Sequence, residues 1–508
     1  MCRKYIATII IIISLFTYQT YAKTYLVDKA IDLKGKTLSL SKTDVLIFEN
    51  NGQLTNGIVI GDNAYVKAPH RVVFRDVVLK GEFKSEIAYS EWFGVKADCV
   101  LNNKNILVSG TDNTQALAYL FLFDNVEIAH GQYMVRGELK CRSNQRINGN
   151  GAIIKCLNKG ACLCVDGKSS TPVSNVVIRN ITIIGGKNDY DDKTEFWDGI
   201  DIGYAKNVLI ENVNAEYCRG DGFYIGTGIG TKKDNRIPKD IRLQNVKAYH
   251  NHRQGLSITR AKGVLIKNSE FCYTEGTPPQ RGIDIEPNCR KCEDGSWNIG
   301  ICDDIEIDSC IFRGNAVAGI VLFKVPDVVN QNKFIIKNIT IKNSLFEDDD
   351  IYIEGGKNIK LENLTLQNSV IGVVEKSAVK NLTISHITMQ ESRWINGRNA
   401  IELDYAKNGA VKKNIQINNV NIRGYGGAGI IVKSGDKDDV QYNKVVISNC
   451  TISNCGKGIV TGNNVKNLKD INNKVVSDKP ISCWIGGGIL LFGFVGFAGK
   501  RIINRKTS

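Results

Sequence analysis

The chain of 508 residues has only 8 prolines against 49 glycines, and it lacks the motifs of several large protein classes. No nucleic-acid-binding motif is present. The one Cys-x-x-Cys, in PNCRKCEDG at 287–295, has neither a second copy nor paired histidines, which argues against a zinc site. No leucine frame of fixed length runs through the chain, which argues against a leucine-rich repeat. Asn, Gly, Ile and Val are abundant instead, and this predicts many short strands joined by tight turns.

The first residues have the pattern of a secretory signal. Arg3 and Lys4 precede an apolar run at 6–16, and Thr20-Tyr21-Ala22 has small residues at both ends of a cleavage tripeptide. The apolar run is too short to span a bilayer comfortably. We therefore expect residues 1–22 to be a signal peptide, cleaved before Lys23, and the protein to be exported.

The other end carries an uncharged stretch, PISCWIGGGILLFGFVGFAG at 480–499, followed by four basic residues. It is about long enough to cross a membrane, and its basic tail fits a cytoplasmic end. It also resembles the C-terminal sorting signals of some bacterial surface proteins. We expect residues 480–508 to attach the protein to the membrane or cell surface, and leave open whether the segment is permanent or processed.

The net charge is modest once these ends are set aside. Six of the +14 charges lie on basic residues of the two end segments, which leaves +8 for residues 23–479. This excess is a weak indication of an anionic partner. We expect a polysaccharide partner, no nucleic acid, and a monomer.

Fifteen cysteines in an exported chain suggest an oxidising compartment. We expect a disulfide between Cys289 and Cys292 in their loop, and Cys450 and Cys455 are spaced to pair across a turn. Others are expected to be buried as small apolar residues. This group consists of Cys218, Cys272 and Cys310.

A nine-residue pattern recurs ten times between residues 175 and 452. The copies are NVVIRNITI (175), NVLIENVNA (207), DIRLQNVKA (240), GVLIKNSEF (263), DIEIDSCIF (304), NITIKNSLF (338), NIKLENLTL (358), NLTISHITM (381), NIQINNVNI (414) and KVVISNCTI (444). RVVFRDVVL at 71 resembles an earlier copy. Each copy reads as a strand, a one-residue kink and a second strand.

The sixth position of the pattern is the kink. It is Asn in eight copies, with Ser309 and His386 as the exceptions. Asn tolerates the left-handed backbone, and its amide bonds to neighbouring groups, so stacked copies predict an Asn ladder. We expect this ladder to be buried. The N-x-T sequons on it, at Asn180, Asn363 and Asn449, are then accidental.

Most copies are followed by a second strand unit of the form x-G-apolar-x-apolar, such as DGIDIG at 198–203 and DGFYIG at 221–226. Two strand units, a ladder turn and repeats of about twenty residues predict a right-handed parallel β-helix, an all-β solenoid in which each rung is stable only against its neighbours. We expect leader rungs at 23–90, the β-helix at 91–465 and a linker at 466–479.

Residues 91–155 carry EWFGVKADC, GTDNTQALAYL and HGQYMVRGELKCRSNQRINGNGAIIK. This resembles the N-terminal segment of pectate-lyase-superfamily β-helix proteins, with an insertion between Cys99 and Gly110. The resemblance covers about residues 30–465, and it implies a short capping helix, opened by Thr111 or Asp112. It implies the fold but not the activity, because this fold carries lyases, hydrolases, epimerases and binders.

Two columns of polar residues cross four successive second strands. The residue before each Gly is Asp198, Asp221, Gln254 and Arg281, and the residue two after it is Asp201, Tyr224, Ser257 and Asp284. Alternation with buried Ile, Leu and Phe predicts that the second column faces outward. Asp before Gly is also ordinary turn chemistry, which would make Asp198 and Asp221 structural.

The same rungs resemble polygalacturonase-like glycoside hydrolases. FWDGIDI, GDGFYIG and RQGLSIT stand where that family has NTDGIDI, GDDCIAI and GHGISIG. The resemblance implies catalytic aspartates at Asp198 and Asp221, but Gly222 and Gln254 replace the family's third Asp and its His. His252 and Arg253, just before Gln254, and Asp284 are further catalytic candidates.

Inserted loops at 185–197, 226–240, 273–282 and 286–297 surround these rungs and are expected to border a groove. Trp197, Tyr224 and Trp297 are candidates to stack on sugar rings. Glu286, Glu293 and Asp294 are candidates for Ca²⁺, as in many pectate lyases, although no fixed ligand spacing supports it. Glu286 also counts among the substrate-binding candidates, and no cofactor other than Ca²⁺ is expected.

These observations favour a glycoside hydrolase acting in an open groove, with Asp221 as general acid and Asp198 as base. One alternative is a polysaccharide lyase or epimerase acting on uronates, for which Arg253, Arg281 and His252 would supply the base and neutralise charge. The other is a non-catalytic glycan-binding or adhesin module.

Overall fold

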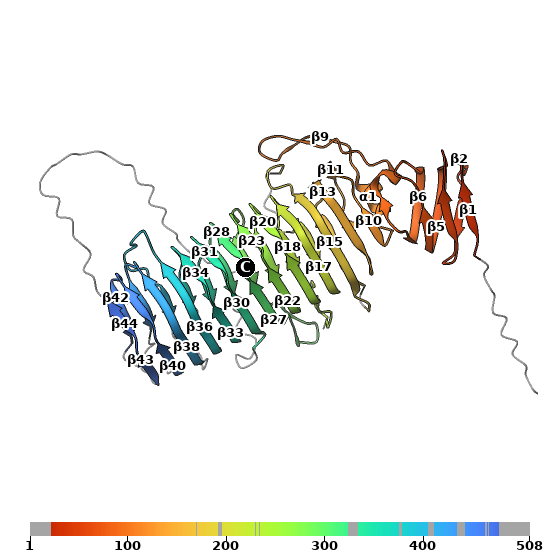
Figure 1. Ribbon diagram of the computed structural model, residues 1–508. Helices are drawn as coiled ribbons and strands as arrows, with labels where there is room; N and C mark the ends of the chain where they lie inside the picture. The colour runs from red at the N-terminus through yellow and green to blue at the C-terminus, as the bar shows by residue number, and fades with distance from the viewer. Residues whose placement is uncertain are drawn as a thin grey trace, which may run out of the picture.

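The computed structural model describes residues 22–476 except 169, 191–195, 229, 233, 324–333, 375–377, 405–410, 434–441, 463–464 and 466. The expected signal peptide, except for Ala22, and the expected C-terminal segment lie outside these residues. The described chain is an elongated stack of parallel strands, with a small sheet at its N-terminal end (Figure 1).

The N-terminal sheet covers the expected leader range. Its strands are β1 (Thr24–Val27), β2 (Ala30–Asp32), β3 (Thr37–Leu40), β4 (Val45–Phe48), β5 (Gln53–Lys67) and β6 (Phe74–Lys84). The early copy at 71 lies in β6, whose Asp76 has a φ of 53° at the kink position. A 3₁₀ turn, η1 (Ser90–Phe93), and the helix α1 (Thr114–Leu120) follow. The Asp112 carboxylate accepts the Thr114 N–H at 2.9 Å, whereas Thr111 bonds to Asp98 instead.

Every rung after α1 contributes to two sheets. The first, here called the bent sheet, contains β7 (Ala88–Tyr89), β10 (Asn125–Glu127), β11 (Gln132–Val135), β13 (Arg146–Cys156), β15 (Val173–Ile184), β17 (Ala205–Glu216), β19 (Lys239–Gln244), β20 (Lys247–Tyr249), β22 (Ala261–Lys267), β23 (Glu270–Cys272), β27 (Cys302–Asp308), β28 (Ile311–Arg313), β30 (Ile336–Lys342), β31 (Leu345–Glu347), β33 (Gly356–Glu362), β34 (Thr365–Gln367), β36 (Val379–Gln390), β38 (Lys412–Arg423), β40 (Tyr442–Ser448), β41 (Thr451–Ser453), β43 (Leu468–Ile471) and β44 (Lys474–Val476).

The second sheet has twelve strands and holds the x-G-apolar units. It consists of β12 (Leu139–Lys140), β14 (Leu163–Val165), β16 (Ile200–Ile202), β18 (Phe223–Ile225), β21 (Gln254–Ile258), β24 (Arg281–Ile285), β29 (Ala318–Leu322), β32 (Ile351–Ile353), β35 (Ile371–Val373), β37 (Ile401–Leu403), β39 (Ala428–Val432) and β42 (Lys457–Thr461). We call the turns that carry the chain from the bent sheet into this twelve-strand sheet the leading corner. Two short hairpins, β8 (Val100–Leu101) with β9 (Leu107–Ser109) and β25 (Cys289–Lys291) with β26 (Trp297–Ile299), lie outside both sheets.

The ten copies stack in register, as the repeat predicts. Their fourth residues pair from rung to rung, and all ten have no exposed surface. These residues are Ile178, Ile210, Leu243, Ile266, Ile307, Ile341, Leu361, Ile384, Ile417 and Ile447. Inward Ile, Val and Leu side chains therefore form one continuous apolar core along the solenoid, and no rung buries its own face alone.

The Asn ladder is present, but its burial is not as expected. Asn212 donates to the Asn180 side chain at 3.1 Å and accepts from Asn245 at 3.1 Å, and all three backbones are left-handed, with φ of 52–57°. Asn212, Asn363 and Asn449 are exposed, because the kink turns the side chain outward. The prediction that the ladder is buried is therefore wrong. Burial gives no reason to call the sequons at Asn363 and Asn449 accidental.

A second Asn ladder runs through the first position of the copies. Asn207 donates to Asn175 at 2.9 Å, and Asn358 donates to Asn338 at 2.8 Å. These residues are also left-handed, with φ of 54–61°. Each copy is thus a strand held between two kinks, five residues apart, and the sequence analysis recognised only the second.

Two further expectations are corrected. The expected linker at 466–479 contains β43 and β44, which pair with β40 and β41 and extend the solenoid by one rung. All thirteen cysteines in the described part of the chain are free, including Cys289, Cys292, Cys450 and Cys455. Cys218, Cys272 and Cys310 are buried in the interior, as predicted.

Candidate functional site

Asp198 and Asp221 lie on the leading corner of adjacent rungs. Each precedes the Gly that leads into a strand, β16 for Asp198 and β18 for Asp221. The Oδ1 atom of Asp198 accepts a hydrogen bond of 2.7 Å from the Asp221 N–H. Asp198 is partly exposed, whereas Asp221 is only 1% exposed. The rung stacking therefore brings the two carboxyl groups together, but leaves only one of them accessible.

Arg253, from the next rung, is the counter-ion of this pair. Its Nη1 atom lies 3.2 and 3.0 Å from the two carboxylate oxygens of Asp221, and it donates to Ser257 at 3.4 Å. Burial raises the pKa of Asp221, and the guanidinium opposes that rise. Burial and the Asp221 charge hold the pKa of Asp198 well above its usual range. The arrangement favours a protonated Asp198 beside an ionised Asp221.

Gln254, Arg281 and Asp284 form a closed network on the next two rungs. The Gln254 side chain donates to Asp284 Oδ2 at 2.7 Å and accepts the Arg281 N–H at 3.0 Å. Arg281 Nη1 donates to Asp284 Oδ1 at 2.7 Å. Asp284 and Gln254 have no exposed surface, and Arg281 is 9% exposed. These groups bond to one another, although Arg281 Nε has no hydrogen-bond partner, and the burial of Asp284 places it out of a substrate's reach.

The residues of the second predicted column, which begins at Asp201, pair with one another on successive strands. Asp201 pairs with Tyr224, Tyr224 with Ser257, and Ser257 with Asp284. Asp201 is partly exposed, and burial, aided by the Asp166 charge, raises its pKa to about 7. Its Oδ1 atom is buried without a protein hydrogen-bond partner. Asp201 is therefore the second accessible carboxyl group of this face.

Tyr224 and Glu286 border the same column. Tyr224 is partly exposed, its hydroxyl lies 2.8 Å from Thr259 Oγ1, and burial raises its pKa to about 12. Glu286 follows β24 and is also partly exposed. Burial and the neighbouring Asp284 charge raise the pKa of Glu286 to about 7. Two partly exposed carboxyl groups with a pKa near neutrality thus lie along this face.

The predicted aromatic platform is only partly available. Trp197 is 8% exposed, packs edge-on against Tyr190 at 5.0 Å, and has the Arg219 guanidinium 5.7 Å from its ring. It is too enclosed to stack on a sugar. Trp297 is partly exposed in β26. The aromatic ring that does project is Phe196, with 76% exposed, which the sequence analysis passed over because no alternation marks it.

His252 lies at the edge of the site. It is partly exposed, its Nδ1 atom is 3.3 Å from Thr277 Oγ1, and burial and the Lys187 charge lower its pKa. The structure records no contact of His252 with Asp198 or Asp221.

The calcium candidates do not converge. Glu293 accepts from Thr231 at 2.8 Å and Asp294 accepts from Ser296 within its own turn. No group of three or more potential metal-binding side chains occurs among the described residues.

The central residues of the expected open groove are buried, which corrects that expectation. Asp221, Gln254, Ser257 and Asp284 are at most 3% exposed. Asn288, which precedes the hairpin β25–β26, donates to the Tyr224 hydroxyl at 3.5 Å. The accessible members are Asp198, Asp201, Tyr224 and Glu286.

The stacked parallel rungs define a right-handed parallel β-helix protein. A family model described as "Right handed beta helix region" matches residues 161–335 and 327–496, and the chain belongs to this family. A curated relative, the SPbeta prophage-derived uncharacterized protein YorA of Bacillus subtilis (strain 168), is 31% identical over 157 residues. The match spans 28% of this chain and only 26% of that protein.

Three solved structures share the fold at low identity. The pre-mature gene product 12 of bacteriophage phi29 has a TM-score of 0.57 at 16% identity, covering 77% of this chain and 52% of that one. PfbA, a surface adhesin of Streptococcus pneumoniae, has 0.52 at 13%, covering 73% and 91%. The catalytic domain of a GH87 alpha-1,3-glucanase, in complex with nigerose, has 0.50 at 15%, covering 72% and 67%. At this identity the likeness concerns the fold alone.

Neither the comparisons nor the fold tests the expected membrane attachment, which stays a prediction. Within the described ranges, no helix has the length and apolar character needed to span a bilayer.

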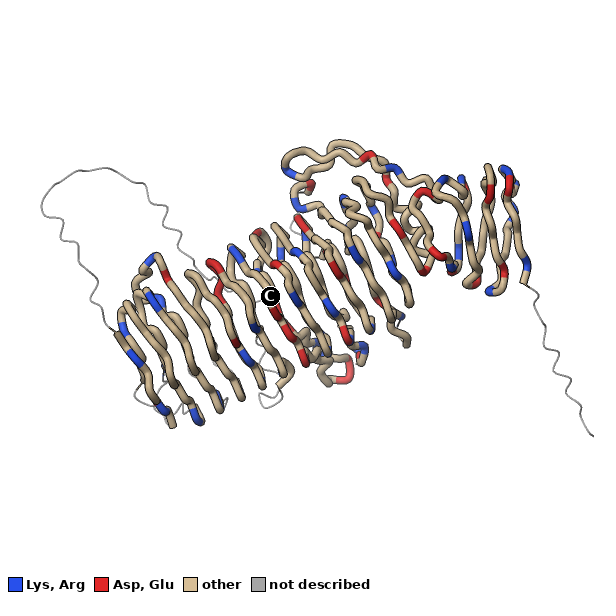
Figure 2. The backbone as a smooth tube through the Cα atoms, viewed as in Figure 1, with Lys and Arg blue, Asp and Glu red and all other residues tan. Residues whose placement is uncertain are grey.

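Figure 2 shows basic and acidic residues mixed along the solenoid rather than gathered into separate blocks.

Proposed function

We propose that this protein is an exported β-helix enzyme that hydrolyses a polysaccharide, with Asp198 as the proton donor. The observation that supports this is the Asp198–Asp221 pair, two carboxyl groups on adjacent rungs that share one counter-ion, Arg253. Because Arg253 binds Asp221, Asp198 is the group that retains a proton. A carboxylic acid that stays protonated near neutral pH is what protonation of a glycosidic oxygen requires.

This assignment reverses the one expected from the sequence. Asp221 is 1% exposed and so cannot contact a polysaccharide, whereas Asp198 is accessible. Asp221 is therefore a positioning residue. It holds Asp198 through its backbone N–H and maintains the proton on Asp198 through its charge.

Asp201 is the carboxylate we assign to water activation. It follows Asp198 by three residues on the same rung, after the bend at Gly199. Its raised pKa, about 7, makes it a stronger base than an ordinary aspartate.

The test is a panel of neutral and acidic polysaccharides, assayed for new reducing ends and for the ultraviolet absorbance of unsaturated uronides. We expect reducing ends without unsaturated product, and loss of activity in Asp198→Asn. Asp240→Asn is the matched control, since Asp240 is an exposed aspartate at the distant ladder turn, with a φ of 56°. Activity retained in Asp198→Asn would overturn the assignment.

Lyase or epimerase chemistry is less well supported by these residues. It requires an accessible base beside a uronate, but Arg253 and Arg281 are engaged by buried carboxylates. The pKa of Tyr224, about 12, makes its hydroxyl a poor source of phenolate at neutral pH. Unsaturated products from an acidic polysaccharide would favour the lyase instead.

A non-catalytic glycan-binding module is the second candidate. The observation that favours it is the burial of Asp221 and Asp284, each bonded to an arginine, which is also how structural ion pairs are arranged. This candidate predicts retention on a glycan array with no product after long incubation.

A further inference from the structure

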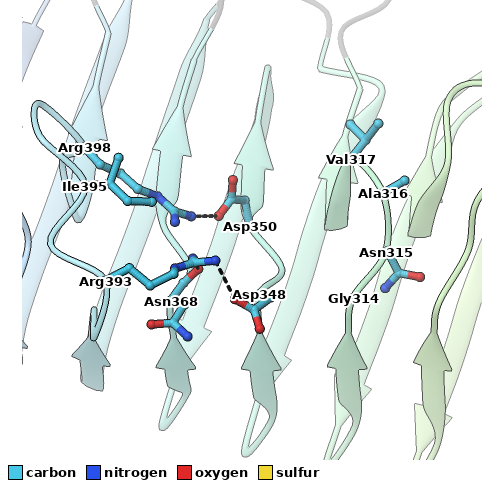
Figure 3. A pocket seen from close by; sticks show the side chains of 10 residues that line it. All are labelled: Gly314, Asn315, Ala316, Val317, Asp348, Asp350, Asn368, Arg393, Ile395 and Arg398. Atoms are coloured by element: carbon cyan, nitrogen blue, oxygen red, sulfur yellow. Dashed lines mark hydrogen bonds and ion pairs between the residues drawn. The ribbon is translucent and has the colours of Figure 1, made fainter. Parts of the chain in front are cut away.

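A cavity of about 480 Å³ lies on the leading corner, nearer the C-terminal end of the solenoid than the Asp198–Asp221 pair. Four successive corner turns form it, at 314–317, 348–350, 368 and 393–398 (Figure 3). They precede β29, β32, β35 and β37, which pair in this order in the twelve-strand sheet. The sequence analysis selected none of these residues.

The polar wall of this cavity is a chain of alternating charges. Arg393 lies 2.9 Å from Asp348 and 3.0 Å from Glu391, while Arg398 lies 2.9 Å from Glu391 and 2.8 Å from Asp350. The Glu391 side chain has no exposed surface and bonds to both guanidinium groups. The network fixes both arginines in place before any ligand arrives, which lowers the entropy lost on binding.

The formal charge of this wall disfavours an anionic ligand. Three carboxylates face two guanidinium groups, so the network carries one net negative charge. Both guanidiniums are already engaged by carboxylates, and a uronate or phosphate would have to displace one of them. A ligand with neutral hydroxyl groups can instead donate to the carboxylates and accept from the remaining N–H groups.

The rim of the cavity is apolar and accessible. Ile395 is 42% exposed and Val317 is 39% exposed, and both line the cavity. Exposed apolar side chains beside fixed polar groups offer the C–H face of a sugar an apolar surface.

We propose that this cavity is a binding site for a neutral polysaccharide segment. Arg393 and Asp348 bond to its hydroxyl groups, and Ile395 packs against the apolar face of a sugar ring. The side chains of Asp348 and Arg393 are 52% and 45% exposed, so both are available to a ligand. The volume lies within the range of small-molecule sites, about 300–1,000 Å³.

This site is separate from the proposed cleavage site but lies on the same corner. Four rung steps, from β18 to β32, lead from Asp221 to Asp350. At about 4.8 Å per rung, this is about 19 Å. The proposal concerns binding only and does not depend on cleavage.

The experiment is affinity electrophoresis and calorimetry of the Asp198→Asn protein, which keeps any substrate intact. The probes are soluble neutral polysaccharides (dextran, xyloglucan and galactomannan), with polygalacturonate and alginate as the anionic comparison. We expect Ile395→Ala and Asp348→Asn each to weaken binding of a neutral probe about tenfold or more. Tyr65→Ala is the control, an exposed side chain (37%) on the N-terminal sheet, and should bind normally.

The ionic-strength dependence adds a second readout. Binding of a neutral chain should change little between low and high salt, whereas binding of a polyanion should weaken strongly. The proposal is overturned if no neutral probe binds, or if the two cavity variants bind neutral probes as well as Tyr65→Ala does. It is also overturned if the anionic probes bind best and lose affinity in both variants. Because binding is measured without turnover, absence of enzymatic activity leaves this test intact.

Discussion

The carboxylate of Asp198 accepts the backbone N–H of Asp221, while the carboxylate of Asp221 binds Arg253. The two aspartates come from sequence motifs that look alike, DGIDIG and DGFYIG, yet they have different environments. One is accessible and lacks a cation of its own, and the other is enclosed with an arginine. Predictions about charge, stability and activity follow from this difference.

Asp198→Asn and Asp221→Asn should separate the two roles. Asp198→Asn should reduce turnover about 10²–10⁴-fold without lowering the melting temperature, because burial favours the neutral form of Asp198 and asparagine is neutral in both the folded and the unfolded state. Asp221→Asn should lower the free energy of unfolding by roughly 1–3 kcal/mol, because it leaves the largely enclosed Arg253 unpaired. Denaturant unfolding and initial rates measure both effects. Equal stability losses in the two variants would contradict the assignment.

The double variant Asp221→Asn with Arg253→Met tests the pairing itself. Removing both partners should recover part of the stability lost on removing one, because no buried charge is left unpaired. A loss equal to the sum of the two single losses would indicate that the ion pair contributes nothing.

Stability should fall between about pH 4 and pH 7 in part because of Asp201. Its pKa is about 7 in the folded protein against 3.8 for an ordinary aspartate, so the folded state binds the proton more tightly. The contribution is full below the unfolded pKa and is lost as the pH rises toward 7. Asp201→Asn should flatten this part of the profile by on the order of 2 kcal/mol. Chemical denaturation across the pH range measures it, and an unchanged slope would contradict the assigned pKa.

The ladder turns can be tested at Asn212. Asn212→Ala should destabilise the protein by about 1–2 kcal/mol, because it removes two amide hydrogen bonds and places a Cβ-bearing residue without a polar side chain at a φ of 54°. Asn212→Gly keeps the backbone freedom and removes only the amide. If the glycine variant matches the wild type, backbone strain rather than the ladder bonds accounts for the loss.

Thiol chemistry should reflect buried, free cysteines. Burial raises the pKa of the Cys141 thiol to about 12, and this residue is 6% exposed. Thiol reagents should therefore react slowly with the ten buried cysteines of the described chain, faster with the partly exposed Cys164, Cys289 and Cys455, and rapidly with all of them after denaturation. The melting temperature should not change with reductant. A marked decrease on reduction would reveal a disulfide.

The fold was predictable because its signal repeats. Ten copies of one pattern fix the alternation and the stacking of rungs, so Ile178 and Ile210 could be placed together without coordinates. The same register placed Asp201 beside Tyr224 and Ser257. The pattern could not predict how deeply each polar side chain is buried. Asp221 and Asp284 are enclosed with arginine partners from other positions, Arg253 and Arg281, and no alternation of the strands marks that pairing.

The Arg393–Asp348 cavity was missed for a related reason. Its residues lie in the corner turns of the rung that carries Ala318 and of the three rungs after it, beyond the four rungs with the polar columns, and each turn alone reads as ordinary turn chemistry. Only stacking brings Asp348, Asn368 and Arg393 to one place. The ladder's burial was misjudged because hydrogen bonding between side chains was equated with enclosure, whereas the left-handed kink directs them outward.

The solenoid also fixes the distance between sites that lie on different rungs. Asn338 and Asn358 occupy equivalent places on neighbouring rungs only twenty residues apart, so a whole rung can be as short as twenty residues. Inserting one such rung between the strands of Arg281 and Ala318 would move Asp198 and Asp348 apart by about 4.8 Å while leaving each set of contacts intact. Relatives that differ by whole rungs would thus hold the same two sites at different intervals. If one glycan occupies both, rung number would select the repeat length of the polymer that fits.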